Sequence, residues 1–558
     1  MKNLLLIISL SLSLATNAQV SFEKSIGSNN YDSGVSTIQT SGGGFVTVSN
    51  TSKYASPDIS FVKMDSRGDT LVTKIVGGAG AEYCHSIQQA SANEYLIVGT
   101  TNTAGAGDDD VFLIKTDSNG VMQYSRIYGG TGKEAGLSIQ PSSDNGYLIA
   151  GSTESFGAGM RDVFIINVDV DGNVIWNKTF GGSGNDIANS VKRTTDGGYI
   201  ITGVSNSFNA NGDDVYLIKI DANGNKLWSK VCGGAGQDIG NSGLQSADGG
   251  YMIVGSTLSF SSGDRDMYII KTDANGTIVF SNVINSISDD CANSVKQTSD
   301  GEYILTGWTN SIMGVSNLCL IKFNDSGDVS FAKKFGGLAE DKGLDVIQTS
   351  DGGYFITGET NTFGGGDYDS YLIKTSSEGT TSCVIKAISV IDTSVSSVSN
   401  VPSDSLSSGV IGASNDVFLS LGRGYSITTP CFYEDAGVTN AFTSENNYDD
   451  NFESEDVYAV RASEMNHLNN NRDFNFNVFP NPNDGKEINL TITSSKGEEI
   501  LVVVCDALGR EHFSKIAVAE NEMEYLFALD PSEKLSSGIY FIIASSKKGS
   551  ETKKLIVK

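Results

Sequence analysis

The chain has 558 residues, too many for one hydrophobic core, so at least two domains are expected. Its 66 acidic and 38 basic residues give a net charge of -28, which repels nucleic acid and anionic membrane surfaces and argues against both as partners. Cations, basic proteins and neutral glycans stay open as ligands.

The N-terminal segment has the pattern of a secretory signal. Lys2 precedes an apolar run from Leu4 to Ala15, and small residues before Gln19 predict cleavage after Ala18. We therefore expect residues 1–18 to be a signal peptide and the protein to pass through the periplasm. No later stretch reaches about 18 consecutive apolar residues, so no transmembrane segment is expected.

Seven repeated units follow, each with four short runs of strand character and no helical period. Their spacings are 50, 52, 52, 52, 52 and 51 residues, and they start near Lys24, Lys74, Arg126, Lys178, Lys230, Asn282 and Lys333. Four antiparallel strands per unit predict a seven-bladed β-propeller over residues 19–379, with an open solenoid as the alternative. The ends of the array favour the ring, because Val20–Gly27 resembles a fourth strand that the last unit lacks.

Three further positions recur in the units and suit a scaffold. A glycine in the second hairpin turn predicts positive φ, and an aromatic residue that opens the second strand is expected to pack between blades. Crowding at the axis predicts small residues on the first strand of each unit. The turn glycines are Gly68, Gly120, Gly172, Gly224, Gly276, Gly327 and Gly379; the aromatics are Phe45, Tyr95, Tyr147, Tyr199, Tyr251, Tyr303 and Tyr354; the axial residues are Ser36, Ser86, Ser138, Ser190, Ser242, Ser294 and Asp345.

Two sets of acidic residues recur in loops that chain direction places on one face. The inner-strand acids precede the first strand of each unit, and the third-strand acids precede the third strand. One hypothesis is an acidic face that binds a cation or a polyhydroxylated ligand; the other is that each carboxylate accepts backbone hydrogen bonds within its loop. The inner-strand acids are Asp32, Glu82, Glu134, Asp186, Asp238, Asp290 and Asp341; the third-strand acids are Asp58, Asp110, Asp162, Asp214, Asp266 and Asp369, with Asn317 in the sixth unit.

Other candidate groups are few. Trp308, beside a variable loop, is a candidate ligand contact, whereas Trp176 and Trp228 occupy equivalent places in successive units and are interpreted as packing residues. "DANGN" resembles half an EF-hand loop but lacks the glutamate at the twelfth position, so it is interpreted as a turn. No cofactor is therefore expected beyond a divalent cation at the acidic loops, and the identity of any metal stays open.

Seven cysteines form an odd set for a secreted protein, so at least one stays free or pairs between chains. Cys383 and Cys431 are the best candidates for a disulfide because both lie outside the repeats. Buried free thiols are the alternative.

The sequence changes character after residue 379. Residues 380–433 are rich in Ser and Val and are expected to add strands beside the propeller, and residues 434–473 form an acidic linker with too few aliphatic residues to fold alone. Residues 474–558 regain strand patterns that predict a small C-terminal antiparallel β-sandwich.

This last segment resembles the type A C-terminal sorting domain of the type IX secretion system of Bacteroidota. The resemblance rests on "FPNPNDG", "DALGR", "LSSGIYFI" and "KKLIVK", and the repeats also resemble propeller repeats common in secreted proteins of these bacteria. It implies that the type IX machinery is a partner and that the protein is secreted or held at the outer cell surface. The motif residues are Pro480, Asn481, Pro482, Gly509, Gly538, Lys553 and Lys554.

Two classes of function remain. We favour a non-catalytic binding or adhesion module for a glycan, a protein or a cation, because the chain has three histidines, the units are nearly equivalent, and no nucleophile has an identifiable base. The alternative is an extracellular enzyme that acts on a polysaccharide through carboxylates of the loop face.

Overall fold

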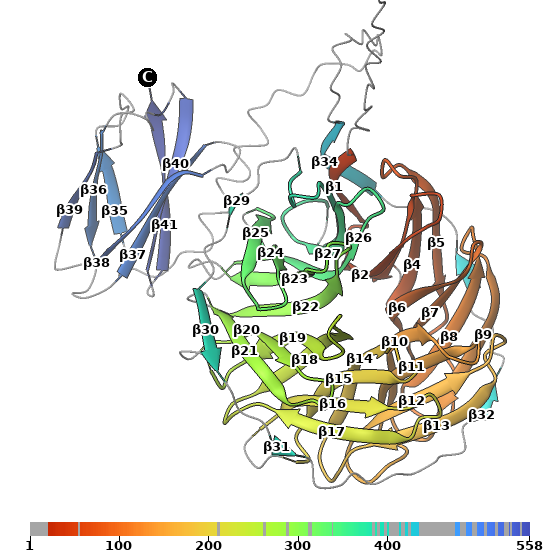
Figure 1. Cartoon of the computed structure of the whole chain (residues 1–558). Coiled ribbons are helices and arrows are strands. Elements are labelled where there is room, and N and C mark those ends of the chain that lie inside the picture. Colours follow the sequence, from red (N-terminus) through yellow and green to blue (C-terminus); the bar gives the residue numbers. More distant parts are fainter. Residues whose placement is uncertain are drawn as a thin grey trace, which may run out of the picture.

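The computed structural model describes residues 20–381, except 54–55, 209–211, 261–263, 286–288, 311–314, 338 and 366, and beyond them strands β29–β41 with a few further residues. Residues 20–381 form seven antiparallel sheets arranged as a ring (Figure 1). The protein is an all-β, seven-bladed propeller in this part of the chain, and no helix occurs among the described residues.

Each blade contains four strands in chain order from the axis outward. The first strands of neighbouring blades contact one another around the whole ring, which places them innermost. Blade 1 consists of β2 (Asp32–Gln39), β3 (Phe45–Thr51), β4 (Asp58–Met64) and β5 (Thr70–Gly77), and blade 2 consists of β6 (Glu82–Ser91), β7 (Glu94–Thr101), β8 (Asp110–Asp117) and β9 (Met122–Gly129). Blade 3 consists of β10 (Glu134–Pro141), β11 (Tyr147–Thr153), β12 (Asp162–Val168) and β13 (Val174–Phe180), and blade 4 consists of β14 (Asp186–Arg193), β15 (Tyr199–Ser205), β16 (Asp214–Ile220) and β17 (Lys226–Cys232).

The N-terminal strand closes the ring, as predicted. β1 (Val20–Gly27) pairs antiparallel with β28, with Ser25 opposite Tyr371, and so supplies the fourth strand of blade 7. Blade 5 consists of β18 (Asp238–Gln245), β19 (Tyr251–Thr257), β20 (Asp266–Thr272) and β21 (Ile278–Asn285), and blade 6 consists of β22 (Asp290–Gln297), β23 (Tyr303–Asn310), β24 (Ser316–Phe323) and β25 (Val329–Phe335). Blade 7 consists of β26 (Asp341–Gln348), β27 (Tyr354–Thr360), β28 (Asp369–Thr375) and β1.

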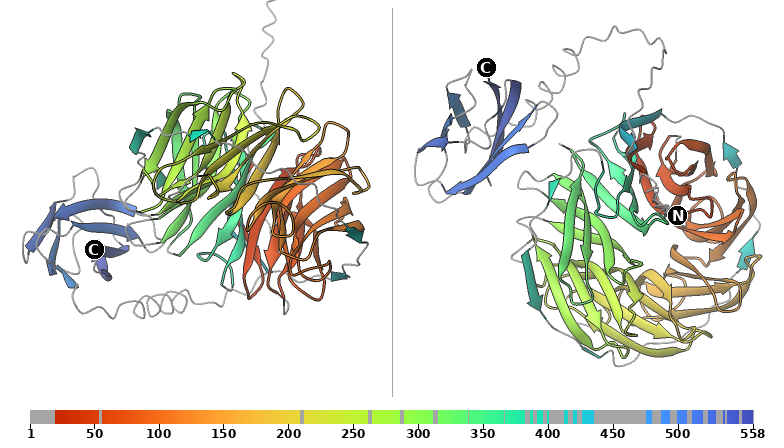
Figure 2. Two further views of the ribbon diagram at one scale, coloured as in Figure 1. Left: turned by 90° about the horizontal axis from the view of Figure 1, so that it is seen from below. Right: turned by 45° about the horizontal axis from the view of Figure 1, so that its top comes forward.

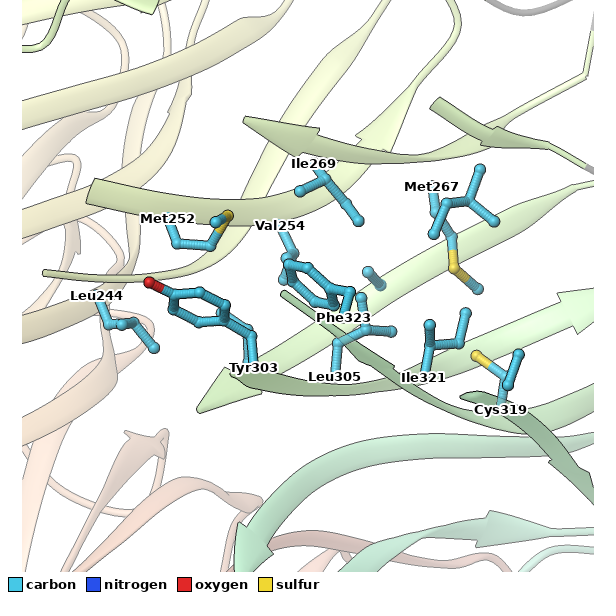
Figure 3. Close-up of a cluster of buried hydrophobic side chains, with 14 residues drawn as sticks. Leu244, Met252, Val254, Met267, Ile269, Tyr303, Leu305, Cys319, Ile321 and Phe323 are labelled. Carbon is cyan, nitrogen blue, oxygen red and sulfur yellow. The ribbon is translucent and has the colours of Figure 1, made fainter. Parts of the chain in front are cut away.

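The hydrophobic core is divided among the blade interfaces. Between blades 5 and 6, side chains such as Met252 and Ile269 pack against Tyr303 and Phe323 (Figure 3). The predicted aromatic contacts between blades are confirmed where Phe45 stacks on a phenylalanine of blade 7, with ring centroids 4.1 Å apart. Because these apolar side chains pack between neighbouring blades, the second and third strands are buried along almost their whole length.

The turn glycines adopt the predicted positive φ. Gly224 has φ +78°, and a Cβ there would lie 2.7 Å from the ring of Trp176 in the preceding blade. The same relation holds between Gly276, with φ +75°, and Trp228. Both tryptophans are therefore interblade packing residues, as their repetition indicated.

A segment after the propeller adds an outer strand to six of the seven blades among the described strands. It visits the blades in reverse order, and its short strands pair antiparallel with β25, β21, β17, β9, β5 and β1 in turn, at the outside of the ring (Figure 2). We call this segment the belt. Its strands are β29 (Lys386–Ala387), β30 (Ile391–Val395), β31 (Ser399–Asn400), β32 (Gly412–Ser414), β33 (Leu419–Leu421) and β34 (Ser426–Glu434).

The C-terminal strands form two antiparallel sheets, in the orders β35-β36-β39 and β38-β37-β40-β41. Their packing as a sandwich stays a prediction, as do the boundaries of the linker and of the belt as separate units. The strands are β35 (Asn475–Phe479), β36 (Glu487–Thr493), β37 (Glu499–Asp506), β38 (Glu511–Val518), β39 (Met523–Ala528), β40 (Gly538–Ser546) and β41 (Gly549–Val557).

Candidate functional site

The inner-strand acids are buried and bind their own loops. Glu82 Oε2 accepts the Gly78 N–H at 2.6 Å, and Oε1 accepts the Thr101 hydroxyl at 2.9 Å. Glu134 repeats the first contact with Gly130 at 2.7 Å. All seven inner-strand acids are at most 2% exposed. These bonds join the loop to the first and second strands of the blade, which supports a structural role.

The third-strand acids explain the glycine at the end of the fourth strand in blades 1 and 2. Asp58 Oδ1 lies against Gly77, where a Cβ would be 1.7 Å away, and Asp110 Oδ1 has the same relation to Gly129. The third-strand acids are at most 4% exposed. At Gly77 and Gly129 a larger residue would collide with these carboxylates.

The two sets of acids meet at the junctions between blades. Burial, and next the charge of Glu82, raise the pKa of Asp58 to about 6. Burial and Glu134 likewise raise the pKa of Asp110 to about 6, and burial with Asp32 does so for Asp369. Both sets of acids thus lie beneath the surface, and Asp58, Asp110 and Asp369 carry less charge near pH 6 than exposed carboxylates would. Their contact with a ligand stays a prediction.

The structure describes no group of three or more His, Cys, Asp or Glu side chains that could hold a metal ion. In the "DANGN" segment, Asp221 Oδ1 accepts the N–H groups of Asn223 and Asn225, both at 2.8 Å. The aspartate therefore closes a tight turn between the third and fourth strands, as the sequence indicated.

One part of the loop face departs from the sevenfold pattern. Tyr31 precedes β2, Tyr368 precedes β28, and their rings lie 5.5 Å apart. Tyr83, the second residue of β6, lies close enough for its charge to contribute to the raised pKa of Tyr31, which has burial as its main cause. Tyr31 is 39% exposed and Tyr83 is 43% exposed, so both rings are available to a ligand.

Two carboxylates and one ammonium group lie among these rings. The Tyr31 hydroxyl donates to Glu359 Oε2 at 2.7 Å. Lys342 Nζ lies 3.3 Å from Glu340 and 3.4 Å from Glu359, and 5.8 Å from the centroid of the Tyr368 ring. A hydrogen bond from Tyr368 lowers the pKa of Glu340. We call Tyr31, Tyr83, Glu340, Glu359, Tyr368 and Lys342 the tyrosine cluster.

Sequence reasoning missed the tyrosine cluster because it sought positions that are constant among the units. The cluster is instead marked by positions that differ among the units. The position of Tyr31 holds Ala81 in blade 2, and the position of Tyr83 holds Ala135 in blade 3. Trp308 of blade 6 is the counterpart of Glu359, since each pairs with the second residue of its inner strand. Trp308 is partly buried, one blade from the cluster, and its contact with a ligand stays a prediction.

The remaining candidate groups are one histidine and the cysteines. Burial lowers the pKa of His85 to about 4, so this histidine is neutral near pH 7. Cys84, Cys232, Cys291 and Cys319 are buried free thiols. Cys383 lies outside the described residues, and Cys431 lies in β34 opposite Glu23, so the proposed disulfide stays a prediction.

The sorting motif falls partly within the described strands. Gly538 opens β40, and Lys553 and Lys554 lie in β41 opposite Ile542 and Phe541. Pro480, Asn481, Pro482 and Gly509 lie outside the described residues. In the part of the chain that the structure describes, no helix has the length and hydropathy of a membrane span.

Comparison with known proteins separates the two parts of the chain. Residues 477–558 match the family of secretion system C-terminal sorting domains. A curated relative, the regulatory protein FlaEY of Caulobacter vibrioides, is 26% identical over 163 residues, which cover 25% of this chain and 17% of that protein.

Solved structures resemble the chain only distantly. A eukaryotic initiation factor is 9% identical with a TM-score of 0.30, covering 62% of this chain and 90% of that chain. A tetra-tandem repeat from the extending region of a large adhesion protein is 12% identical with a TM-score of 0.13, covering 97% of this chain and 93% of that chain. With the sorting domain at its C-terminus, the protein is a β-propeller exported by the type IX secretion system to the cell surface or the extracellular space.

Proposed function

We propose that the exported propeller is a binding or adhesion module that holds a glycan at the tyrosine cluster. The observation that carries this proposal is the pair of exposed rings, Tyr31 and Tyr83, beside Glu359 on one side of the loop face. Tyrosine combines an apolar ring, which can pack on the C–H face of a sugar, with a polar hydroxyl.

The charged members of the cluster suit sugar hydroxyl groups. Carboxylate oxygens of Glu340 and Glu359 accept hydrogen bonds, and the Lys342 ammonium donates them. Each bond to a charged group contributes about 1.5–3 kcal/mol when it forms away from bulk water. Because Lys342 already contacts both carboxylates, their geometry is held before a ligand arrives.

A polysaccharide-cleaving enzyme is the alternative, since both carboxylates contact one ammonium group and so lie near each other. Glycoside hydrolysis needs one carboxyl group that stays protonated near the working pH. The hydrogen bond from Tyr368 lowers the pKa of Glu340 instead. Binding is therefore the better supported of the two functions.

A glycan array probed with the full mature protein tests the proposal. The test variant combines Tyr31→Ala with Tyr83→Ala, which introduce the residues that other blades have at these positions, so the fold should be retained. We expect the wild type to bind a set of oligosaccharides and the double variant to lose them.

A matched control replaces an exposed apolar residue elsewhere, Leu227→Ala, at 57% exposure on the outer strand of blade 4. This control should bind as the wild type does. Equal binding by the double variant would reject the tyrosine cluster as the site. Release of reducing sugar ends from the bound glycans, lost in Glu340→Gln, would establish the enzymatic alternative.

A further inference from the structure

The inner strands carry a second departure from the repeat, at the end opposite the loop face. The seventh residue of each inner strand lies next to the turn between the first and second strands. In five blades it is apolar or neutral, and in two it is lysine: Ile38, Gln88, Gln140, Lys192, Leu244, Lys296 and Ile347.

The lysine of blade 6 reaches across the blade interface at the axis. Lys296 Nζ lies 3.0 Å from Asp345 Oδ1 of blade 7 and 2.9 Å from the Ser294 hydroxyl oxygen. Asp345 Oδ2 accepts the Ser36 hydroxyl of blade 1 at 3.1 Å. Asp345 takes the place of the serine found in the other six blades, so one carboxylate joins three blades.

The lysine of blade 4 has no such partner. Lys192 makes no ion pair or hydrogen bond with the described residues, although it interacts electrostatically with Lys296 and Asp345 from across the axis. Burial, and next the charge of Lys296, lower the pKa of Lys192 to about 7, and Asp345 opposes this change. Lys192 and Lys296 therefore both lie near one carboxylate, that of Asp345, which Lys296 contacts.

Two lysines beside one aspartate stand out in a chain with a net charge of -28. The groups are also open to solvent, since the Lys296 side chain is 27% exposed and the Asp345 side chain is 15% exposed. Between the lysines, Ser242 accepts the Val295 N–H at 3.3 Å, which leaves its hydroxyl hydrogen able to donate. Ammonium and hydroxyl groups are the donors that bind oxyanions in proteins.

We propose that the turn-face end of the propeller axis binds a small oxyanion, a carboxylate or phosphate group, between Lys192 and Lys296. The anion supplies the second negative charge that the lysine pair lacks, with Asp345 holding Lys296 in position. This site is separate from the tyrosine cluster, which lies at the loop-face end of the axis.

Isothermal titration of the full mature protein with inorganic phosphate, sulfate or glucuronate tests the proposal. Lys192→Leu introduces the residue that blade 5 has at this position and breaks no ion pair with a described residue. We expect this variant to lose about tenfold or more in affinity for the anion that binds the wild type, as for one lost charge-assisted contact. Preference for glucuronate over phosphate would identify a carboxylate as the ligand group, and the reverse a phosphate.

Two further variants complete the test. Lys296→Gln, with the residue of blade 2, should also weaken binding, whereas the control Lys133→Gln, a side chain that is 48% exposed on the loop face, should bind as the wild type does. Absence of binding to all three anions by the folded wild type would overturn the proposal, and so would unchanged affinity in Lys192→Leu. Glycan binding at the tyrosine cluster should persist in Lys192→Leu, so the two proposals fail independently.

Discussion

The junction between blades 1 and 2 offers a direct test of how buried carboxylates affect this fold. We predict that Asp58→Asn stabilises the propeller at pH 7.5 and has little effect at pH 3. Asparagine has the same shape without the charge, and Asn317 already occupies the equivalent position in blade 6. Within the described residues, the buried Oδ1 of Asp58 accepts no hydrogen bond that the substitution would remove.

The magnitude follows from the pKa. Burial and Glu82 raise the pKa of Asp58 from 3.8 to about 6, so the fold holds a proton that the unfolded chain releases between these values. Protonated Asp58 therefore contributes its full amount to the free energy of unfolding below about pH 4, and this contribution is lost as the pH rises through 6. At pH 7.5 ionised Asp58 costs about 3 kcal/mol, because each pKa unit corresponds to about 1.4 kcal/mol.

Thermal unfolding followed by calorimetry measures the effect. Recovery of about 1–3 kcal/mol by Asp58→Asn at pH 7.5 would raise the Tm of a propeller of this length by roughly 1–4 °C. Asp264→Asn removes the same charge from an exposed loop and serves as the control, with little change expected at either pH. A lower Tm for Asp58→Asn at pH 7.5 would refute the reasoning, because it would mean that the charge of Asp58 stabilises the junction.

Three other predictions concern the scaffold and its export. Gly224→Ala should lower the Tm more than Gly197→Ala, because both glycines have positive φ but only a Cβ at Gly224 meets a ring, 2.7 Å from Trp176; equal losses by calorimetry would contradict this. A chain ending at residue 381 lacks the belt and exposes outer strand edges, so light scattering should show more aggregation than for the full chain; identical scattering would count against an edge-covering role. Deletion of residues 474–558 should leave the folded propeller in the periplasm, and fractionation that finds it outside the cell at normal yield would disprove the export route.

The fold was predictable because each unit repeats the same turn glycines and the same four strand patterns. Glycine at positive φ, as at Gly224, and the displaced strand Val20–Gly27 indicate turns and ring closure from local patterns alone. The belt was only partly predictable, since strands such as β31, of two residues, are too short to show a period of two. Their position depends on the free edges of blades far away in the sequence.

The candidate site could not be found by the same reasoning. Repetition identified the two sets of acids, which are buried, and Glu82 accepts a hydrogen bond from Thr101 of its own blade. The asymmetric groups come from blades that are distant in sequence. Tyr31 and Glu359 are 328 residues apart and meet only because β1 closes the ring between blades 7 and 1.

The central claim, that the tyrosine cluster binds a glycan, is tested most directly by a crystal structure of the mature protein with an oligosaccharide selected on the array. We expect a sugar ring packed against Tyr31 or Tyr83, with hydroxyl groups within hydrogen-bond distance of Glu340 or Glu359. A sugar bound away from these four residues, whether over the third-strand acids or at the belt, would contradict it.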